Sequence, residues 1–210
     1  MTPVRIALCC SLLAAAACGN VAPSSQLPWL VGVQVLALSD SPTEAAAHDA
    51  IALGASDEAA YGALEVRGDL AGDGEPERVL ASYGLGIVVL DAAGHSIARV
   101  KPLAREGSAD GVVALAIVER SLLAVAVQAG GHRESEITLS LYRLGDHGLQ
   151  LLVALPVEEH DGDATRIGGI VMLPGTLLYR APGAAAATTW RYDARHLRYL
   201  ELPVQPAPLH

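Results

Sequence analysis

Short hydrophobic runs separated by turn residues dominate the chain from Leu64 to Leu202. The runs are rich in valine, leucine and isoleucine, and Gly, Asp and His separate them. Runs of this kind, bounded by turn residues, are typical of β-strands. Apolar and polar residues alternate in "ERVLASYG" and "EITLSLYRL", as expected for strands with one wetter face. The pattern predicts an all-β region that is almost entirely antiparallel.

The predicted strands group into three units of four. The first unit holds "ALEVRGDL", "ERVLASYG", "GIVVLDAAG" and "SIARV"; the second holds "GVVALAIVE", "LLAVAVQAG", "EITLSLYRL" and "GLQLLVALPV"; the third holds "GGIVMLPG", "TLLYRAPG", "TTWRYDA" and "RYLEL". Tight turns are predicted between the third and fourth strands, at Asp91 to Gly94, Gly145 to Gly148 and Asp193 to His196. A spacing of roughly 45 residues is typical of propeller blades, although closed propellers have about four to eight. We therefore expect a propeller-like stack or a sandwich of antiparallel four-stranded units.

One short helix is expected before these units. "SPTEAAAHDAIALGAS" predicts a helix from about Pro42 to Leu53, with Ser41 or Thr43 as its cap. His48 and Asp49 are expected on its solvated face. The preceding run, "PWLVGVQVLALS", reads as a strand or as a short buried helix. This N-terminal strand and helix are expected to cover an open edge of the β region.

The first residues have the pattern of a secretory signal. "MTPVRIALCCSLLAAAACGN" has a basic residue, Arg5, an apolar run from Ile6 to Ala17, and small residues before Cys18. The apolar run is shorter than the ~20 residues that span a bilayer. We expect this segment to be removed on export. The predicted organisation is a signal peptide at 1–17, a lipidated cysteine and tether at 18–28, a strand and helix at 29–63, the β-domain at 64–202 and a tail at 203–210.

"AAAACGN" resembles the lipobox of bacterial lipoproteins, with Ala15 where leucine is usual. The resemblance implies that Cys18 is acylated, becomes the new N-terminus and anchors the protein to a membrane. Gly19 after the cysteine implies the outer membrane. The alternative is ordinary cleavage after Ala17 with Cys18 as a free thiol. All three cysteines lie within this segment, the other two being Cys9 and Cys10, so the mature chain holds no disulfide.

The net charge limits the classes of molecule that the protein is expected to bind. The net charge is −9, from 23 Asp and Glu against 14 Lys and Arg, and no basic patch is clustered in the sequence. This balance disfavours nucleic acid as a ligand, because its phosphates require a basic surface. Anionic headgroups are disfavoured for the same reason. The expected partners are a membrane, through the lipid anchor, and an unidentified protein or glycan.

The stretch "GDLAGDGEPERVLASYG", followed by "GIVVLDAAG", resembles the FG-GAP or VCBS repeat, a calcium-loop blade of integrin α-type propellers. The resemblance covers about Glu65 to Val100. It implies oxygen ligands at the first, third, fifth and ninth loop positions, with one backbone carbonyl; these positions are Asp69, Ala71, Asp73, Glu77 and, for the carbonyl, Glu75. Ala71 supplies no ligand. The alternative is a hairpin turn without an ion.

Oxygen ligands of this kind suit Ca²⁺, which takes about 6 to 8 oxygens. We therefore expect weak, structural calcium binding, or no ion, at this loop. A second acidic cluster, "EEHDGDA", begins at Glu158 and mixes carboxylates with His160. It is interpreted as a solvated loop between the second and third units, with a transition-metal site as the alternative.

Motifs for catalysis are lacking. The sequence has no G-x-S-x-G elbow, H-E-x-x-H, P-loop or dinucleotide fingerprint. Trp190 and Tyr192 alternate on a predicted strand, and core packing is expected for both. The sequence favours a non-catalytic binding or structural protein. The alternative is an exported metal-dependent hydrolase, which would require the second acidic cluster to converge with Asp73 and Glu77 in one pocket.

Overall fold

The computed structural model describes residues 26–82, 84–101, 111–119, 121–131 and 134–202. Strands predominate in these ranges, and the helices among them are α1 (Glu44–Ala52) and α2 (Asp57–Ala60). Both helices precede the first strand of the predicted β-domain. The predicted all-β class is therefore confirmed, with a second short helix that the sequence analysis did not identify.

The strands form three sheets. Sheet I contains β3 (Leu64–Gly68), β4 (Glu77–Ser82), β5 (Gly86–Leu90) and β6 (Ser96–Val100), in that order. Sheet II contains, from edge to edge, β11 (Ala164–Ile167), β10 (Gly148–Asp161), β9 (Glu134–Gly145), β8 (Leu122–Gly130), β7 (Gly111–Val118) and β2 (Val35–Ser39). Sheet III contains β1 (Leu30–Val31), β12 (Gly169–Leu173), β13 (Thr176–Arg180), β14 (Thr188–Asp193) and β15 (Arg198–Glu201).

Each predicted four-stranded unit lies in a sheet of its own, and its strands are neighbours in chain order. The pairings within the units are antiparallel, while β1 pairs with β12 in parallel. The predicted turns between third and fourth strands are present. At two of them an aspartate accepts backbone N–H bonds: Asp91 from Ala93 and His95, and Asp193 from Arg195.

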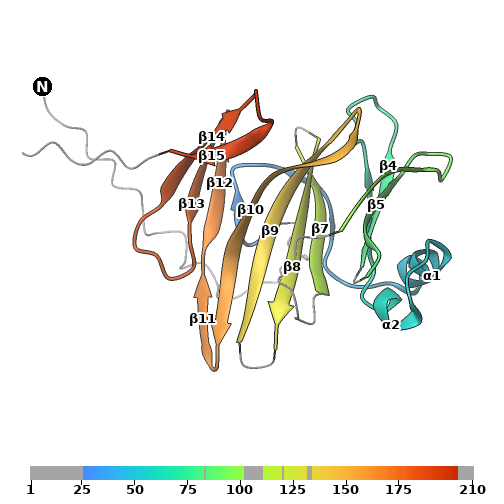
Figure 1. Ribbon diagram of the computed structural model, residues 1–210, viewed down its shortest axis with the longest axis horizontal. Coiled ribbons are helices and arrows are strands. Elements are labelled where there is room, and N and C mark those ends of the chain that lie inside the picture. The colour runs from blue at the N-terminus through green and yellow to red at the C-terminus, as the bar shows by residue number, and fades with distance from the viewer. Residues whose placement is uncertain (1–25, 83, 102–110, 120, 132–133, 203–210) are drawn as a thin grey trace, which may run out of the picture.

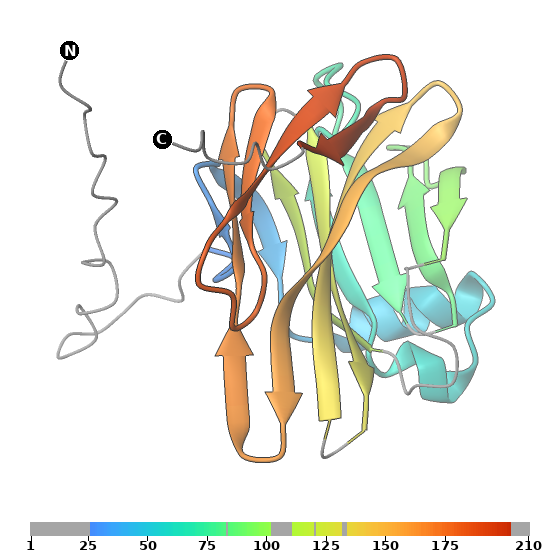
Figure 2. The ribbon, with the colours of Figure 1, turned by 60° about the vertical axis from the view of Figure 1, so that its left-hand side comes forward.

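The sheets stack face to face in layers, with sheet II between sheets III and I, and the two helices on the outer face of sheet I (Figures 1 and 2). Three hydrophobic clusters separate these layers. The first lies between sheets III and II, the second between sheets II and I, and the third between sheet I and the helices. The arrangement is that of a sandwich with an added layer.

This layering explains the most hydrophobic runs in the sequence. All five residues of β5 ("GIVVL") are buried, because one face packs on sheet II and the other on the helices. In β8, six consecutive residues from Leu122 to Val127 are buried between sheets III and I. Strands covered on both faces have continuous apolar sequences and not alternating ones. The layer order is thus reflected in the sequence of each strand.

The N-terminal segment is part of the stack. β1 joins sheet III, and β2 pairs with β7 at the edge of sheet II. Helix α1 begins after Thr43, whose hydroxyl accepts from the Ala46 N–H at 3.1 Å. The expectation that this segment covers an open edge holds for β2. It is wrong for the helix, which packs on a face of sheet I because its buried alanines permit close approach.

The aromatic residues of β14 belong to the core, as predicted. Trp190 and Tyr192 pack against the cluster between sheets II and III. The Trp190 ring meets Tyr179 edge to face with centroids 6.4 Å apart, and Tyr192 meets Tyr199 at 5.4 Å. Such arrangements are the favoured geometry for aromatic pairs.

Candidate functional site

The acidic loop suggested by the sequence connects β3 to β4 at one end of sheet I. Its first carboxylate, Asp69, accepts hydrogen bonds from three backbone N–H groups of its own loop, those of Gly72, Asp73 and Gly74, at 2.6, 3.0 and 3.0 Å. Gly72 and Gly74 have φ angles of 79° and 92°. These left-handed conformations favour glycine, and they turn the N–H groups toward Asp69.

Glu77 closes the loop from its other end. It is the first residue of β4, and only 5% of its surface is exposed. Its Oε2 accepts from the Leu70 N–H at 2.6 Å and from the Ala71 N–H at 3.0 Å. A buried carboxylate is costly unless it is hydrogen-bonded, so these two bonds account for its burial. Glu77 therefore fixes the start of the loop to the start of the next strand.

The other two predicted ligands are on the surface. Asp73 and Glu75 are exposed, and the Asp73 Oδ1 accepts from the Glu75 N–H at 3.0 Å. The chemical type of these oxygens fits Ca²⁺. Their geometry is that of a turn held by its own amides, and no metal-ready group of three or more His, Cys, Asp or Glu occurs in the described part of the chain. Calcium binding at Asp69, Asp73, Glu75 and Glu77 stays a prediction.

The second acidic cluster lies on a strand and not in the solvated loop that the sequence suggested. Glu158, Glu159 and His160 lie within β10, which pairs with β9 on one side and β11 on the other. The connecting turn is confined to Gly162 and its neighbours. The segment is a polar hairpin, and the loop expected between the second and third units is absent there.

Alternation along β10 divides the side chains of this hairpin between two faces. On one face, Glu158 accepts from the Trp29 indole N–H at 2.8 Å and lies 2.8 Å from His160 Nε2. The other ring nitrogen of His160, Nδ1, lies 3.0 Å from the Thr165 hydroxyl and extends this series of polar contacts. On the other face, Arg166 lies 3.6 Å from Glu159. The first set links Trp29, near the start of the described residues, to the edge of sheet II.

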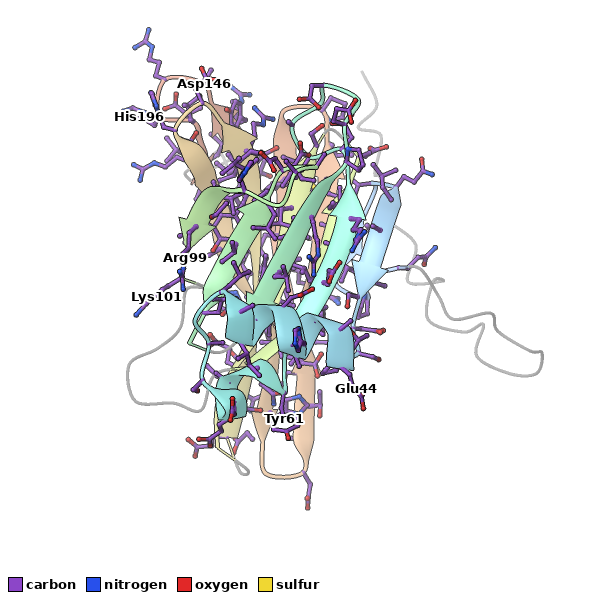
Figure 3. All side chains as sticks on the ribbon, turned by 90° about the vertical axis from the view of Figure 1, so that its right-hand side faces the viewer. Glu44, Tyr61, Arg99, Lys101, Asp146 and His196 are labelled. Carbon is purple, nitrogen blue, oxygen red and sulfur yellow. The ribbon has the colours of Figure 1, made fainter. Side chains whose placement is uncertain are left out.

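The two acidic clusters do not converge. The β3–β4 loop belongs to sheet I, and the β10–β11 hairpin forms the far edge of sheet II. Figures 1 and 3 show the hairpin at the bottom of the view and the loop at the top. Asp73 and Glu77 therefore share no pocket with Glu158, His160 or Asp161.

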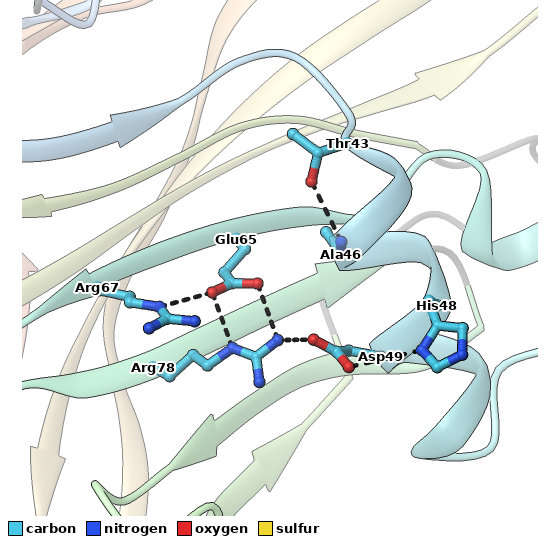
Figure 4. A network of polar contacts seen from close by, with 7 residues as sticks. All are labelled: Thr43, Ala46, His48, Asp49, Glu65, Arg67 and Arg78. Carbon is cyan, nitrogen blue, oxygen red and sulfur yellow. Dashed lines mark hydrogen bonds and ion pairs between the residues drawn. The ribbon is translucent and has the colours of Figure 1, made fainter.

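An ion-pair network that the sequence analysis did not identify joins α1 to sheet I (Figure 4). Arg78 on β4 donates to both carboxylate oxygens of Glu65, at 2.8 and 2.9 Å, and also contacts the carboxylate of Asp49. Arg67 donates to Glu65 at 2.9 Å. The expectation of a solvated face is correct for the exposed His48 and wrong for Asp49, which turns toward the sheet.

Tyr179 is a buried residue whose surroundings shift its pKa. Its hydroxyl donates to the Pro156 carbonyl at 2.8 Å. Burial, and to a lesser degree the negative charges of Glu136 and Glu159, raise the pKa of Tyr179 to about 12. Such a phenol stays neutral at physiological pH and acts as a hydrogen-bond donor between sheets III and II.

No protein family, curated protein or solved structure matches this chain. The resemblances to the lipobox and to the FG-GAP or VCBS repeat therefore stay predictions. Cys18 lies outside the described residues. Among the helices that the structure does describe, none is long and apolar enough to cross a membrane.

Proposed function

We propose that the protein is an exported, membrane-anchored lipoprotein whose β-domain is non-catalytic and serves a binding or structural role. The observation that carries this proposal is the position of the cysteines. All three fall within the first 18 residues, and Cys18 follows the apolar run and small residues of a secretory signal. Lipid attachment explains why the mature, exported chain would begin with a cysteine that has no disulfide partner.

The way in which the chain enters the fold supports this proposal. Leu27, Trp29 and Leu30 are 3%, 8% and 5% exposed and belong to the cluster between sheets II and III. The Trp29 carbonyl accepts from the Ile170 N–H at 2.8 Å, and its indole donates to Glu158. At most about 30 Å of extended chain separates Cys18 from Leu27. A lipid on Cys18 would hold the domain close to the bilayer.

The hydrolase alternative requires the two acidic clusters to meet in one pocket, whereas the β3–β4 loop and the β10–β11 hairpin lie on different sheets, at the top and the bottom of Figure 1. A binding or structural role needs no such convergence. We infer a protein or glycan partner at the outer membrane, and no nucleic acid, because of the net charge of −9.

We further propose that the β3–β4 loop takes calcium weakly and for rigidity. The hydrogen bonds of Asp69 and Glu77 already hold the loop in shape. A cation would add carboxylate and carbonyl contacts to a turn that is formed without it. The ion would have no part in a reaction.

The Cys18→Ala variant tests the anchor. Membrane fractionation should move this variant into the soluble fraction or leave its precursor uncleaved, and a labelled fatty acid should be incorporated only into the wild type. Cys10→Ala, in the predicted signal, is the matched control and should behave as the wild type. A correctly cleaved Cys18→Ala protein that stays with the membrane would contradict the proposal.

A further inference from the structure

A groove runs between α1 and α2 on the outermost layer of the molecule. It has a volume of about 690 Å³. Its apolar part includes Ala47, Ile51, Ala60 and Tyr61. Ile51 is 44% exposed and Tyr61 is 80% exposed, and Figure 3 places Tyr61 on the helical face of the molecule. Large apolar side chains gathered at a groove, and not scattered singly, are typical of interaction sites.

The groove also carries uncompensated negative charge. Glu44, in the first turn of α1, and Asp57, in the first turn of α2, both line it. Among the residues described, neither carboxylate has a hydrogen bond or an ion pair to a cation. Each stabilises the positive end of its helix, but that role does not require both to line the same groove. Glu58, also in the first turn of α2, is not part of the lining.

The layers place this groove far from the anchor. The chain enters the fold at sheet III, whereas the helices lie beyond sheet I. Successive layers are about 10 Å apart, so roughly 30 Å separate the two outer layers. Under the proposed function, on which this step rests, the lipid is attached on the sheet III side, opposite to the helical layer. The tether therefore does not cover the helical layer where a partner would dock.

We propose that the α1–α2 groove docks a basic, amphipathic segment of a partner protein. An apolar side chain of that segment packs on Ile51 and Tyr61. A lysine or arginine beside it pairs with Glu44 and Asp57. Amphipathic segments that lie in grooves with an apolar floor are a recurring mode of peptide recognition. The acidic rim then selects the sign of the charge next to the apolar contact.

The same charges disfavour two other occupants. A second copy of this chain, docked symmetrically, would bring the same patch against itself, and the carboxylates of both copies would face each other. An anionic bilayer would be repelled by Glu44 and Asp57. A basic partner is the occupant that compensates both carboxylates.

The test uses the full-length chain purified in a nonionic detergent and a fluorescein-labelled peptide of lysines with leucine at every third or fourth position. Fluorescence anisotropy at low ionic strength should show binding to the wild type. Exposed ion pairs are weak, so we expect Glu44→Gln with Asp57→Asn to raise Kd about fivefold. Tyr61→Ser should raise it about tenfold, through loss of the apolar contact. Peptides with glutamate for lysine, or serine for leucine, should not bind.

Two controls match these variants. Glu58→Gln removes the same charge from the same helical turn as Asp57→Asn, and Ile97→Ser removes an exposed apolar side chain from β6. Both should leave Kd unchanged. Equal effects of Asp57→Asn and Glu58→Gln would overturn the proposal, since general attraction to an acidic chain would then explain binding. Absence of binding to the wild type would also overturn it.

Sedimentation of the same samples tests whether a second copy of this chain occupies the groove. Self-association of the wild type that is lost in Tyr61→Ser would assign the groove to a second copy and overturn the proposal. A failure here is distinguishable from a failure of the proposed function. Membrane fractionation of Cys18→Ala does not depend on Glu44, Asp57 or Tyr61.

Discussion

Replacing Glu77 by alanine tests whether the acidic loop is held by its own hydrogen bonds. The substitution removes a carboxylate that is 5% exposed and leaves the N–H groups of Leu70 and Ala71 without their acceptor. An unsatisfied buried donor costs about 1 to 3 kcal/mol. The Leu70 N–H is buried and has no access to water, whereas the Ala71 N–H is partly exposed and can be hydrated. We therefore expect a loss of about 3 kcal/mol in the free energy of unfolding.

A second substitution separates the loss of the hydrogen-bond acceptor from the loss of its negative charge. Glu77→Gln keeps an oxygen at the same position, so both N–H groups retain an acceptor. Hydrogen bonds to an ionised acceptor are about twice as strong as neutral ones, so this variant should lose about 1 to 2 kcal/mol. Glu75→Ala, in the same loop, removes an exposed side chain with no role in holding the turn. It should change the free energy of unfolding by less than about 0.5 kcal/mol.

Thermal unfolding of the full-length chain, followed by circular dichroism, measures these differences. For a domain of this size, about 1 kcal/mol corresponds to a shift of about 2 to 4 °C in Tm. Glu77→Ala should therefore melt about 6 to 12 °C below the wild type, with Glu77→Gln between them. If Glu77→Ala melts within about 2 °C of the wild type, the hydrogen bonds of Glu77 do not hold the loop, and this reasoning is refuted.

Three further measurements follow from other parts of the structure. Calcium at a hundred times its Kd should stabilise the wild type by about 2.7 kcal/mol relative to chelator, and Asp73→Ala should abolish that shift; identical melts would mean that the loop binds no ion. Arg78→Met should lose about 2 kcal/mol, because Asp49 is left without an arginine partner and Glu65, which is partly buried, keeps only Arg67. The same change at the exposed Arg67 should lose less than about 0.5 kcal/mol, and equal losses would contradict the role of the network. Because the folded pKa of Tyr179, about 12, lies above its ordinary value of 10.0, its contribution to stability is present below pH 10 and is lost as pH rises toward 12. Urea unfolding over this pH range should therefore show a steeper decline for the wild type than for Tyr179→Phe, and parallel curves would exclude the shift.

The strands of the three units could be predicted because each local signal agreed with the final packing. "GIVVL" is continuously apolar since β5 is covered on both faces, and Thr43 precedes α1 because its hydroxyl caps the helix. The second helix was missed because α2 has only four residues, too few for a periodic pattern. Its cap, Ser56, was the available signal.

The "EEHDGDA" segment was misinterpreted for an identifiable reason. All four residues of β11 are exposed, and the end of β10 is only partly buried. This hairpin extends sheet II by a short, exposed edge strand, β11, whose one charged residue is Arg166. Short edge strands with a charge on them resist pairing with other chains. The polar end of a half-exposed strand and a solvated loop have similar compositions, so composition does not distinguish them. The decisive contact, between Trp29 and Glu158, joins residues 129 positions apart and has no local signature.

The composition of the third hydrophobic cluster explains why an ion-pair network lies beside it. From the helical segment this cluster takes alanines, at positions 46, 50, 60 and 63, and on the side of sheet I it holds Leu80, Leu85, Val88 and Leu90. Alanine has a single methyl group and buries little apolar area. Each buried CH₂ contributes about 0.8 kcal/mol to stability, so burial stabilises the helical layer less than it stabilises the contacts between sheets. The contact of Asp49 with Arg78 therefore has a larger share in holding α1 than it would have beside a leucine-rich interface.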